Sequence, residues 1–132
     1  MSVNLLISIV DDDEAARASI VGLVRALGFT AREYPGAAEF LSSAYLLQTA
    51  CLIADMRMPV MTGLELYRHL VAAGTAIPTI LVTAFPDEAL RARAAGSALP
   101  FATVDRASGR VVGCTRFANI APEHRRVEIG WT

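Results

Sequence analysis

The chain has 132 residues, a formal net charge of −1 and an apolar content of 54%. This length is enough to bury about two-thirds of the unfolded surface in one domain, and the balanced charge gives no general attraction to nucleic acid or anionic membranes. No apolar run approaches the ~20 residues that span a bilayer, and residues 1–4 lack the basic region of a signal peptide. We therefore expect a cytoplasmic protein with no direct nucleic-acid or membrane partner, and its oligomeric state is left open.

Four short runs in the first 95 residues are predicted to be strands. Each is bounded by polar or turn-forming residues, which is typical of strands buried in a parallel sheet. The second run is more polar and is expected at or near an edge of the sheet. The predicted strands are Leu5–Val10, Phe29–Tyr34, Cys51–Asp55 and Thr79–Thr83.

A predicted helix follows each of these strands. Apolar residues recur at helical spacing after the first strand, and Thr62 with Glu65 has the pattern of a capping box at the start of the third helix. The helices are expected from Ala16 to Gly28, from Pro35 to Leu41, from Thr62 to Gly74 and from Pro86 to about Ala95. This strict alternation predicts an α/β fold in which a parallel sheet is covered on both faces.

The pattern changes after Gly96. Two further strands are expected at Phe101–Asp105 and Val111–Ile120, and charged and apolar residues then alternate from Arg125 to Trp131. Short strands separated by turn signals predict an antiparallel β meander. We therefore divide the chain into residues 1–95 and residues 96–132.

Cys51 and Cys114 both lie in strand-like apolar runs. Two cysteines make no disulfide framework, and a role as small buried hydrophobic residues is more common at such positions than a disulfide or a metal pair.

Polar side chains stand at the ends of three predicted strands: Asp11 and Asp12 after the first, Asp55 at the end of the third and Thr83 at the end of the fourth. The carboxyl ends of parallel strands meet at one edge of the sheet, where ligands bind. Three carboxylates held close together repel one another unless a cation lies among them, and hard oxygen ligands suit magnesium. A metal-held aspartate can accept a phosphoryl group, to which the Thr83 hydroxyl could donate. The alternative is that the acids only cap the first helix, but capping does not explain Asp55 and Thr83.

These strand ends closely resemble the receiver domain of two-component response regulators. The resemblance covers residues 5–95 and is carried by Ile9–Asp12, Leu52–Gly63 and Leu81–Ala84. It implies a flavodoxin-like, doubly wound parallel sheet in the order 2-1-3-4, and a sensor histidine kinase as partner. It also implies the site residues: Asp55 as phosphoacceptor, Asp11, Asp12, Asp55 and the Arg57 backbone carbonyl as Mg²⁺ ligands, and Thr83 as the switch hydroxyl.

The chain departs from this family after the fourth strand. The family has a fifth strand ending in Lys-Pro, where the lysine pairs with the phosphoryl group, followed by a fifth helix; neither is seen here. If the tail supplies a fifth strand, the lysine position falls near Val104 and Phe101 could serve as the switch aromatic, with Arg106 the nearest cation. We therefore expect phosphoryl uptake with impaired switching.

The tail has a second resemblance, to the early strands of GNAT-type N-acetyltransferases. It is carried by Leu99–Asp105, Gly109–Phe117 and Arg125–Thr132, and it stops before that family's acetyl-CoA pyrophosphate loop. No cofactor site or acetyltransferase activity is therefore expected. Our first hypothesis is a signalling module that is not an enzyme; the alternatives are an acetyltransferase-related protein and a non-functional chimera.

Overall fold

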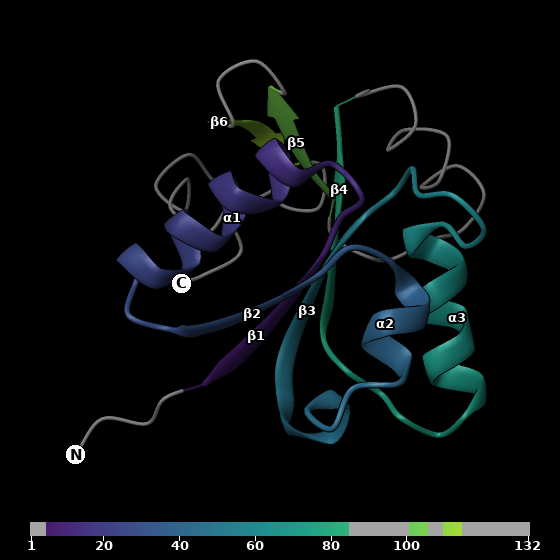
Figure 1. Cartoon of the computed structure of the whole chain (residues 1–132). Helices are drawn as coiled ribbons and strands as arrows, with labels where there is room; N and C mark the ends of the chain where they lie inside the picture. Colours follow the sequence, from purple (N-terminus) through teal and green to yellow (C-terminus); the bar gives the residue numbers. More distant parts are fainter. Residues whose placement is uncertain (1–4, 85–100, 106–109, 115–132) are drawn as a thin grey trace.

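The computed structural model describes residues 5–84, 101–105 and 110–114 (Figure 1). These residues form a six-stranded sheet in the order β2-β1-β3-β4-β5-β6. The first five strands pair in parallel, and β6 pairs antiparallel to β5. The strands are β1 Leu6–Val10, β2 Thr30–Tyr34, β3 Thr49–Asp55, β4 Thr79–Thr83, β5 Phe101–Asp105 and β6 Arg110–Cys114. The helices are α1 Glu14–Ala26, α2 Ala37–Leu41 and α3 Gly63–Ala72, with a 3₁₀ turn, η1, at Leu46–Gln48.

The helices cover the two faces of the sheet, with α1 on one side and α2 and α3 on the other (Figure 1). Two separate clusters of buried side chains match this arrangement. In β3, Ile53 packs in the cluster that contains α1 residues, whereas Leu52 and Ala54 pack in the cluster with α2 and α3 residues. Successive side chains of a strand point to opposite faces, so a strand buried on both faces is apolar throughout, as the sequence pattern indicated.

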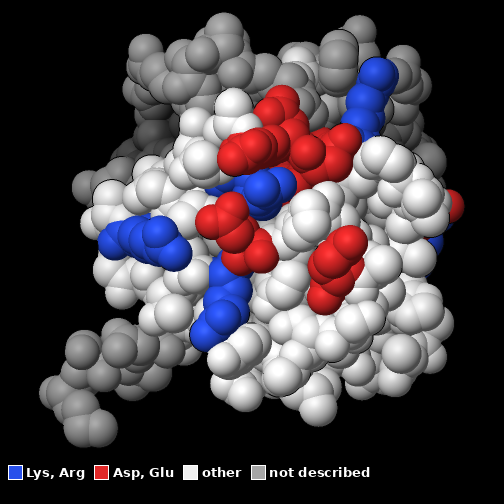
Figure 2. Space-filling view, viewed as in Figure 1, with Lys and Arg blue, Asp and Glu red and all other residues white. Residues whose placement is uncertain are grey.

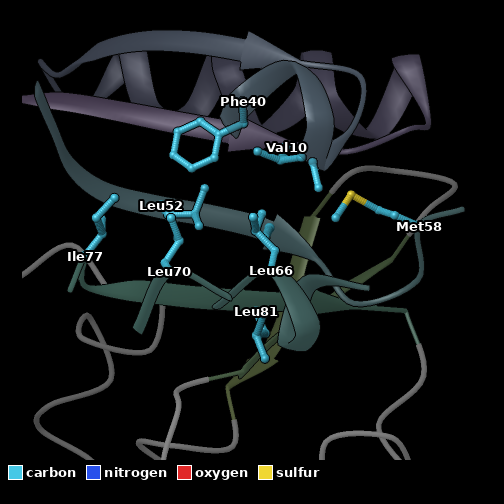
Figure 3. Close-up of a cluster of buried hydrophobic side chains, with 10 residues drawn as sticks. Val10, Phe40, Leu52, Met58, Leu66, Leu70, Ile77 and Leu81 are labelled. Atoms are coloured by element: carbon cyan, nitrogen blue, oxygen red, sulfur yellow. The ribbon is translucent and has the colours of Figure 1, made fainter. Parts of the chain in front are cut away.

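The larger cluster is centred on α2 and α3 (Figure 3). Phe40 is fully buried there, and its ring meets the ring of Tyr34 edge-on, with centroids 5.4 Å apart. Met58, in the loop after β3, is also buried in this cluster. The loop that follows Asp55 is therefore anchored to the hydrophobic core.

The start of each long helix is capped by a side chain. The Asp13 carboxylate accepts from the backbone amides of Ala15 and Ala16, at 3.0 and 3.3 Å. At α3 the capping box is confirmed: the Glu65 amide donates to the Thr62 hydroxyl (3.1 Å), and the Thr62 amide donates to the Glu65 carboxylate (2.9 Å). These bonds satisfy amides that have no partner within the helix.

The predicted strand order 2-1-3-4 is confirmed, and β2 lies at an edge as expected. Several predicted boundaries differ from the observed ones by one or two residues; in particular, β3 begins at Thr49 and not at Cys51. The Thr49 hydroxyl lies 2.8 Å from the Ser8 hydroxyl of β1 and donates to the Tyr45 carbonyl at 2.9 Å. These hydrogen bonds satisfy the Thr49 hydroxyl, so this polar residue can be buried in the sheet.

The tail contributes to the same sheet. β5 pairs in parallel with β4, with Phe101 opposite Leu81 and Thr103 opposite Thr83, so the tail does supply a fifth strand. The antiparallel pairing of β5 and β6 agrees with the first hairpin of the predicted meander. The helix predicted from Pro86 to about Ala95 and the alternating segment from Arg125 lie outside the described residues.

Cys51 is a free, half-buried thiol in β3. Burial raises the pKa of this thiol from 9.0 to about 11, because the thiolate would lose its hydration. The side chain is therefore neutral at ordinary pH, in agreement with its predicted packing role. In the part of the chain that the structure describes, no helix has the length and apolar character needed to cross a membrane.

Candidate metal centre

Three carboxylates meet at the carboxyl edge of the sheet. Asp11 and Asp12 follow β1, Asp55 ends β3, and each offers an oxygen within 4.8 Å of the other two. They come together because β1 and β3 are neighbours, with Val10 paired to Ala54. Figure 2 shows acidic side chains gathered at this end of the molecule, over the start of α1. The positions of these residues at predicted strand ends had indicated this grouping.

The three carboxylates differ in exposure. Asp11 and Asp55 are 1% and 2% exposed, whereas Asp12 is exposed to solvent. Ionised carboxylates this close destabilise one another, and the burial of two of them strengthens the repulsion. An all-oxygen donor set open to water on one side has the chemistry that Mg²⁺ prefers, since this ion keeps several waters. The residues therefore fit a small divalent cation.

Asp11 is held by its backbone and its side chain. Its amide donates to the Tyr34 carbonyl at the end of β2 (3.1 Å), and its carboxylate accepts from the Asp13 amide (2.9 Å). On the other side of the site, the Met56 amide donates to the Val82 carbonyl of β4 at 2.8 Å. Both sides of the acidic cluster are thus tied to neighbouring strands.

Thr83 is the last residue of β4 and is 1% exposed. Asp55 pairs with Val82, so Thr83 is one residue beyond the level of Asp55 at the same edge. The predicted switch hydroxyl therefore belongs to a strand adjacent to that of Asp55.

Arg57 lies in the loop between β3 and α3, and its side chain is exposed. Its backbone carbonyl as a metal ligand stays a prediction. In the same loop Val60 is fully exposed and has a φ of 70°. A β-branched residue is strained in this left-handed region, so the loop is held in an unfavourable backbone conformation beside the cluster.

Phe101 and Val104 lie on β5. The register with β4 puts Val104 one residue past Thr103, the partner of Thr83. Val104, the predicted counterpart of the family's lysine, thus reaches the same edge of the sheet and is followed by Asp105. The switch role of Phe101 stays a prediction.

Gly63, the first residue of α3, approaches the backbone of Asp55 closely. A Cβ at this position would lie 2.5 Å from the Asp55 carbonyl oxygen and 3.0 Å from a Leu81 methyl carbon. No side chain fits without moving the strand end or the helix. The glycine therefore allows α3 to begin directly against the phosphoacceptor candidate.

We predict that Gly63→Ala lowers the free energy of unfolding by about 1–3 kcal/mol, the usual cost of overpacking. Urea denaturation would measure the change. Gly22→Ala is the control, since a Cβ on this exposed residue of α1 meets nothing within 4 Å, and it should leave stability unchanged or raise it. Equal stability of Gly63→Ala and the parent chain would contradict the close approach.

Arg17, on the first turns of α1, was not singled out from the sequence. Its Nη1 donates to the Asp11 backbone carbonyl and its Nε to the Glu33 carboxylate, both at 2.8 Å. A basic residue just after an acidic helix start does not by itself predict these hydrogen bonds. The bond to Glu33 depends on where β2 lies, which the local sequence does not show.

The sheet order 2-1-3-4 and the three carboxylates at its carboxyl edge are the arrangement that the resemblance to receiver domains predicts. A family model described as "Response regulator receiver domain" matches residues 7–99, and the chain belongs to this family. The response regulator protein TmoT of Ectopseudomonas mendocina is 36% identical over 123 residues, which cover 91% of this chain and 56% of that protein. The transcriptional regulatory protein FixJ of Azorhizobium caulinodans is 34% identical over 94 residues, covering 71% of this chain and 44% of FixJ. The chain spans about half the length of these curated relatives.

Solved structures agree with this assignment. The structure of FixJ-N is 31% identical and matches with a TM-score of 0.63, covering 76% of this chain and 81% of that one. The chemotaxis protein CheY4 of Vibrio cholerae has a TM-score of 0.65 at 20% identity, covering 80% of this chain and 92% of that one, and this likeness shows the fold alone.

The similarity to TmoT covers more of the chain than the family model does, and so it reaches into residues 96–132. That segment is also the one predicted from its sequence to be an acetyltransferase-like fragment. That resemblance, and the division into two parts, stay predictions.

Proposed function

We propose that the chain is the phosphoacceptor module of a two-component phosphorelay in the cytoplasm, and that Asp55 accepts a phosphoryl group from a sensor histidine kinase. The observation that supports this most is the cluster of Asp11, Asp12 and Asp55 on a receiver fold. Asp55 is the acceptor in this proposal because it ends a central strand of the sheet.

The proposed Mg²⁺ ligands are Asp11, Asp12, Asp55 and the Arg57 carbonyl. When bound, the ion neutralises charge on the phosphoryl oxygens. The chain's own residues hold the site in place: the amide of buried Asp11 donates to the Tyr34 carbonyl, buried Asp55 pairs with Val82 of β4, and Gly63 at the start of α3 lies against the Asp55 backbone.

In the transfer step a carboxylate oxygen of Asp55 attacks phosphorus and forms an acyl phosphate. The bond between phosphorus and the donor's imidazole nitrogen breaks, and its electron pair remains on that nitrogen. We assign Thr83 the role of donating a hydrogen bond to a phosphoryl oxygen. The product is a covalently modified signalling protein, not a released product of an enzyme.

The test uses acetyl phosphate as a small-molecule donor. Intact-mass measurement should show one added phosphoryl group when Mg²⁺ is present and none when EDTA removes it. A parallel calorimetric titration with acetyl-CoA tests the alternative. Binding of acetyl-CoA together with no phosphoryl uptake would favour an acetyltransferase-related protein and overturn the proposal.

We further propose that the module switches poorly. All twelve basic side chains of the chain are arginines, so the sequence contains no lysine for the β5 position held by Val104. A hydrogen bond to a charged group is worth about 1.5–3 kcal/mol, and a ligand shifts a conformational equilibrium only through contacts that differ between the two states. Loss of that contact should reduce the coupling about ten- to a hundredfold.

Beryllofluoride, a phosphoryl mimic, tests this expectation by amide NMR. With Mg²⁺ present, we expect shifts confined to the carboxyl edge around Asp55. Large shifts that spread through residues 87–95 and 101–104, or dimerisation on adding the mimic, would contradict impaired switching.

A further inference from the structure

Arg17 joins three elements next to the acidic cluster. It lies on α1, its Nη1 donates to the carbonyl of Asp11 at the end of β1, and its Nε donates to Glu33 of β2, each at 2.8 Å. Its side chain is only 15% exposed, whereas that of Glu33 is 44% exposed. The contact with Asp11 is therefore the more buried end of this link.

We propose that Arg17 is a positioning residue for the metal centre, acting by fixing the peptide between Asp11 and Asp12. This inference rests on the proposed function, since it concerns the same Mg²⁺ site. Neither the sequence motifs nor the metal ligands include Arg17.

The carbonyl that Arg17 holds belongs to the peptide unit that connects two ligands. A peptide unit is planar, so fixing its oxygen restricts the direction in which the backbone leaves Asp11 and enters Asp12. The Asp11 amide is held independently by the Tyr34 carbonyl at 3.1 Å. Asp12 itself is exposed, so its placement depends on the backbone that precedes it.

Two donors in a rigid fork suit arginine for this task. The guanidinium presents Nε and Nη1 in one plane, and it reaches a carboxylate on β2 and a carbonyl after β1 at the same time. A lysine ammonium is a single point charge without this fork. Because Glu33 is partly solvated, the ion pair adds little stability, and its consequence is geometric.

The charge of Arg17 allows positioning to be separated from simple electrostatics. A positive charge beside a cation site repels the cation, so removing it without other effects would tighten Mg²⁺ binding. Loss of an outer partner that orients ligands typically weakens metal binding by 10–100-fold. For Arg17→Met, electrostatic repulsion alone therefore predicts tighter Mg²⁺ binding, whereas a positioning role predicts weaker Mg²⁺ binding.

The experiment measures the Mg²⁺ dissociation constant of the full chain by amide NMR, with magnesium chloride as the only added ligand. The temperature is kept well below the thermal unfolding midpoint of each metal-free variant. Under that condition a loss of stability does not by itself change the constant. We expect about tenfold weaker binding for Arg17→Met and a smaller loss of affinity for Arg17→Lys, which keeps the charge but not the fork. Arg25→Met, which removes the same charge from the last turn of α1, should bind as the parent chain does.

Binding by Arg17→Met that equals or exceeds that of the parent chain would overturn the inference. If Arg17→Met does not fold, Arg17→Lys decides, and parent-like affinity in that variant overturns the inference. Failure of the unaltered chain to bind Mg²⁺ would instead overturn the proposed function, and the role of Arg17 with it.

Discussion

Asp55→Asn is expected to abolish phosphoryl uptake from acetyl phosphate. An amide has no anionic oxygen to attack phosphorus, so the acyl phosphate cannot form. Asp55 is 2% exposed, and Asp11 and Asp12 have oxygens within 4.8 Å of it. Because asparagine has the same shape as aspartate, the substitution disturbs this packing little. Intact-mass measurement in the presence of Mg²⁺ follows the modification.

The chain offers a matched control in Asp13→Asn. Asp13 is another carboxylate of the same loop, but its side chain caps α1, and asparagine caps helices about as well as aspartate. This variant should incorporate phosphoryl at the parent rate. Modification that persists in Asp55→Asn, or that disappears in Asp13→Asn alone, would contradict the assignment.

Phe40→Ala is expected to lower the free energy of unfolding by about 3–5 kcal/mol, the range for removing a buried phenyl ring. Phe40 is fully buried, lies among α2, α3 and sheet residues, and makes an edge-on contact with Tyr34 (Figure 3). The expected loss includes both the transfer of the ring to water and the cavity left behind. Urea denaturation of the metal-free chain gives the value.

Leu47→Ala is the control for this measurement, because Leu47 is 81% exposed and substitutions at such positions usually stay within ±0.5 kcal/mol. A loss below about 1 kcal/mol for Phe40→Ala would mean that the core beneath α2 is not packed as described. Such a result would also contradict the anchoring of the loop after Asp55, because Met58 of that loop packs in the same cluster as Phe40.

The sequence predicted the layered sheet well because its central strands, β1, β3 and β4, are buried on both faces. Ile53 and Leu52 belong to opposite clusters, so both had to be apolar and the run was visible. The start of β3 was missed for the opposite reason. Thr49 is polar, and its place in the sheet depends on a hydroxyl contact with Ser8, 41 residues earlier, which no local pattern contains.

Some residues of the candidate site could likewise be predicted from the sequence, and others could not. Asp11, Asp12 and Asp55 could be grouped from the sequence because parallel strand ends share an edge of the sheet. Arg17 could not, since its partner Glu33 is 16 residues away on an edge strand. The need for glycine at position 63 also depends on how closely α3 approaches the end of β3, which is a property of packing.

In the tail, the sequence pattern predicted a strand but not its partner in the sheet. An apolar run at Phe101–Asp105 indicated a strand, but only the structure shows that it pairs in parallel with β4, and in which register. The pairing of Thr83 with Thr103 places Val104 at the carboxyl edge. The predicted counterpart of the family's lysine therefore lies at the same edge of the sheet as the acidic cluster.

The most direct test of the central claim is to locate the modified residue. Treatment of the acetyl phosphate–modified chain with borohydride reduces an acyl phosphate to the alcohol, so the modified aspartate becomes homoserine, which peptide mass spectrometry can place. We predict homoserine at position 55 and at no other aspartate. Homoserine at Asp11 or Asp12 with an unaltered Asp55, or phosphate retained on a hydroxyl such as that of Thr83, would contradict the account.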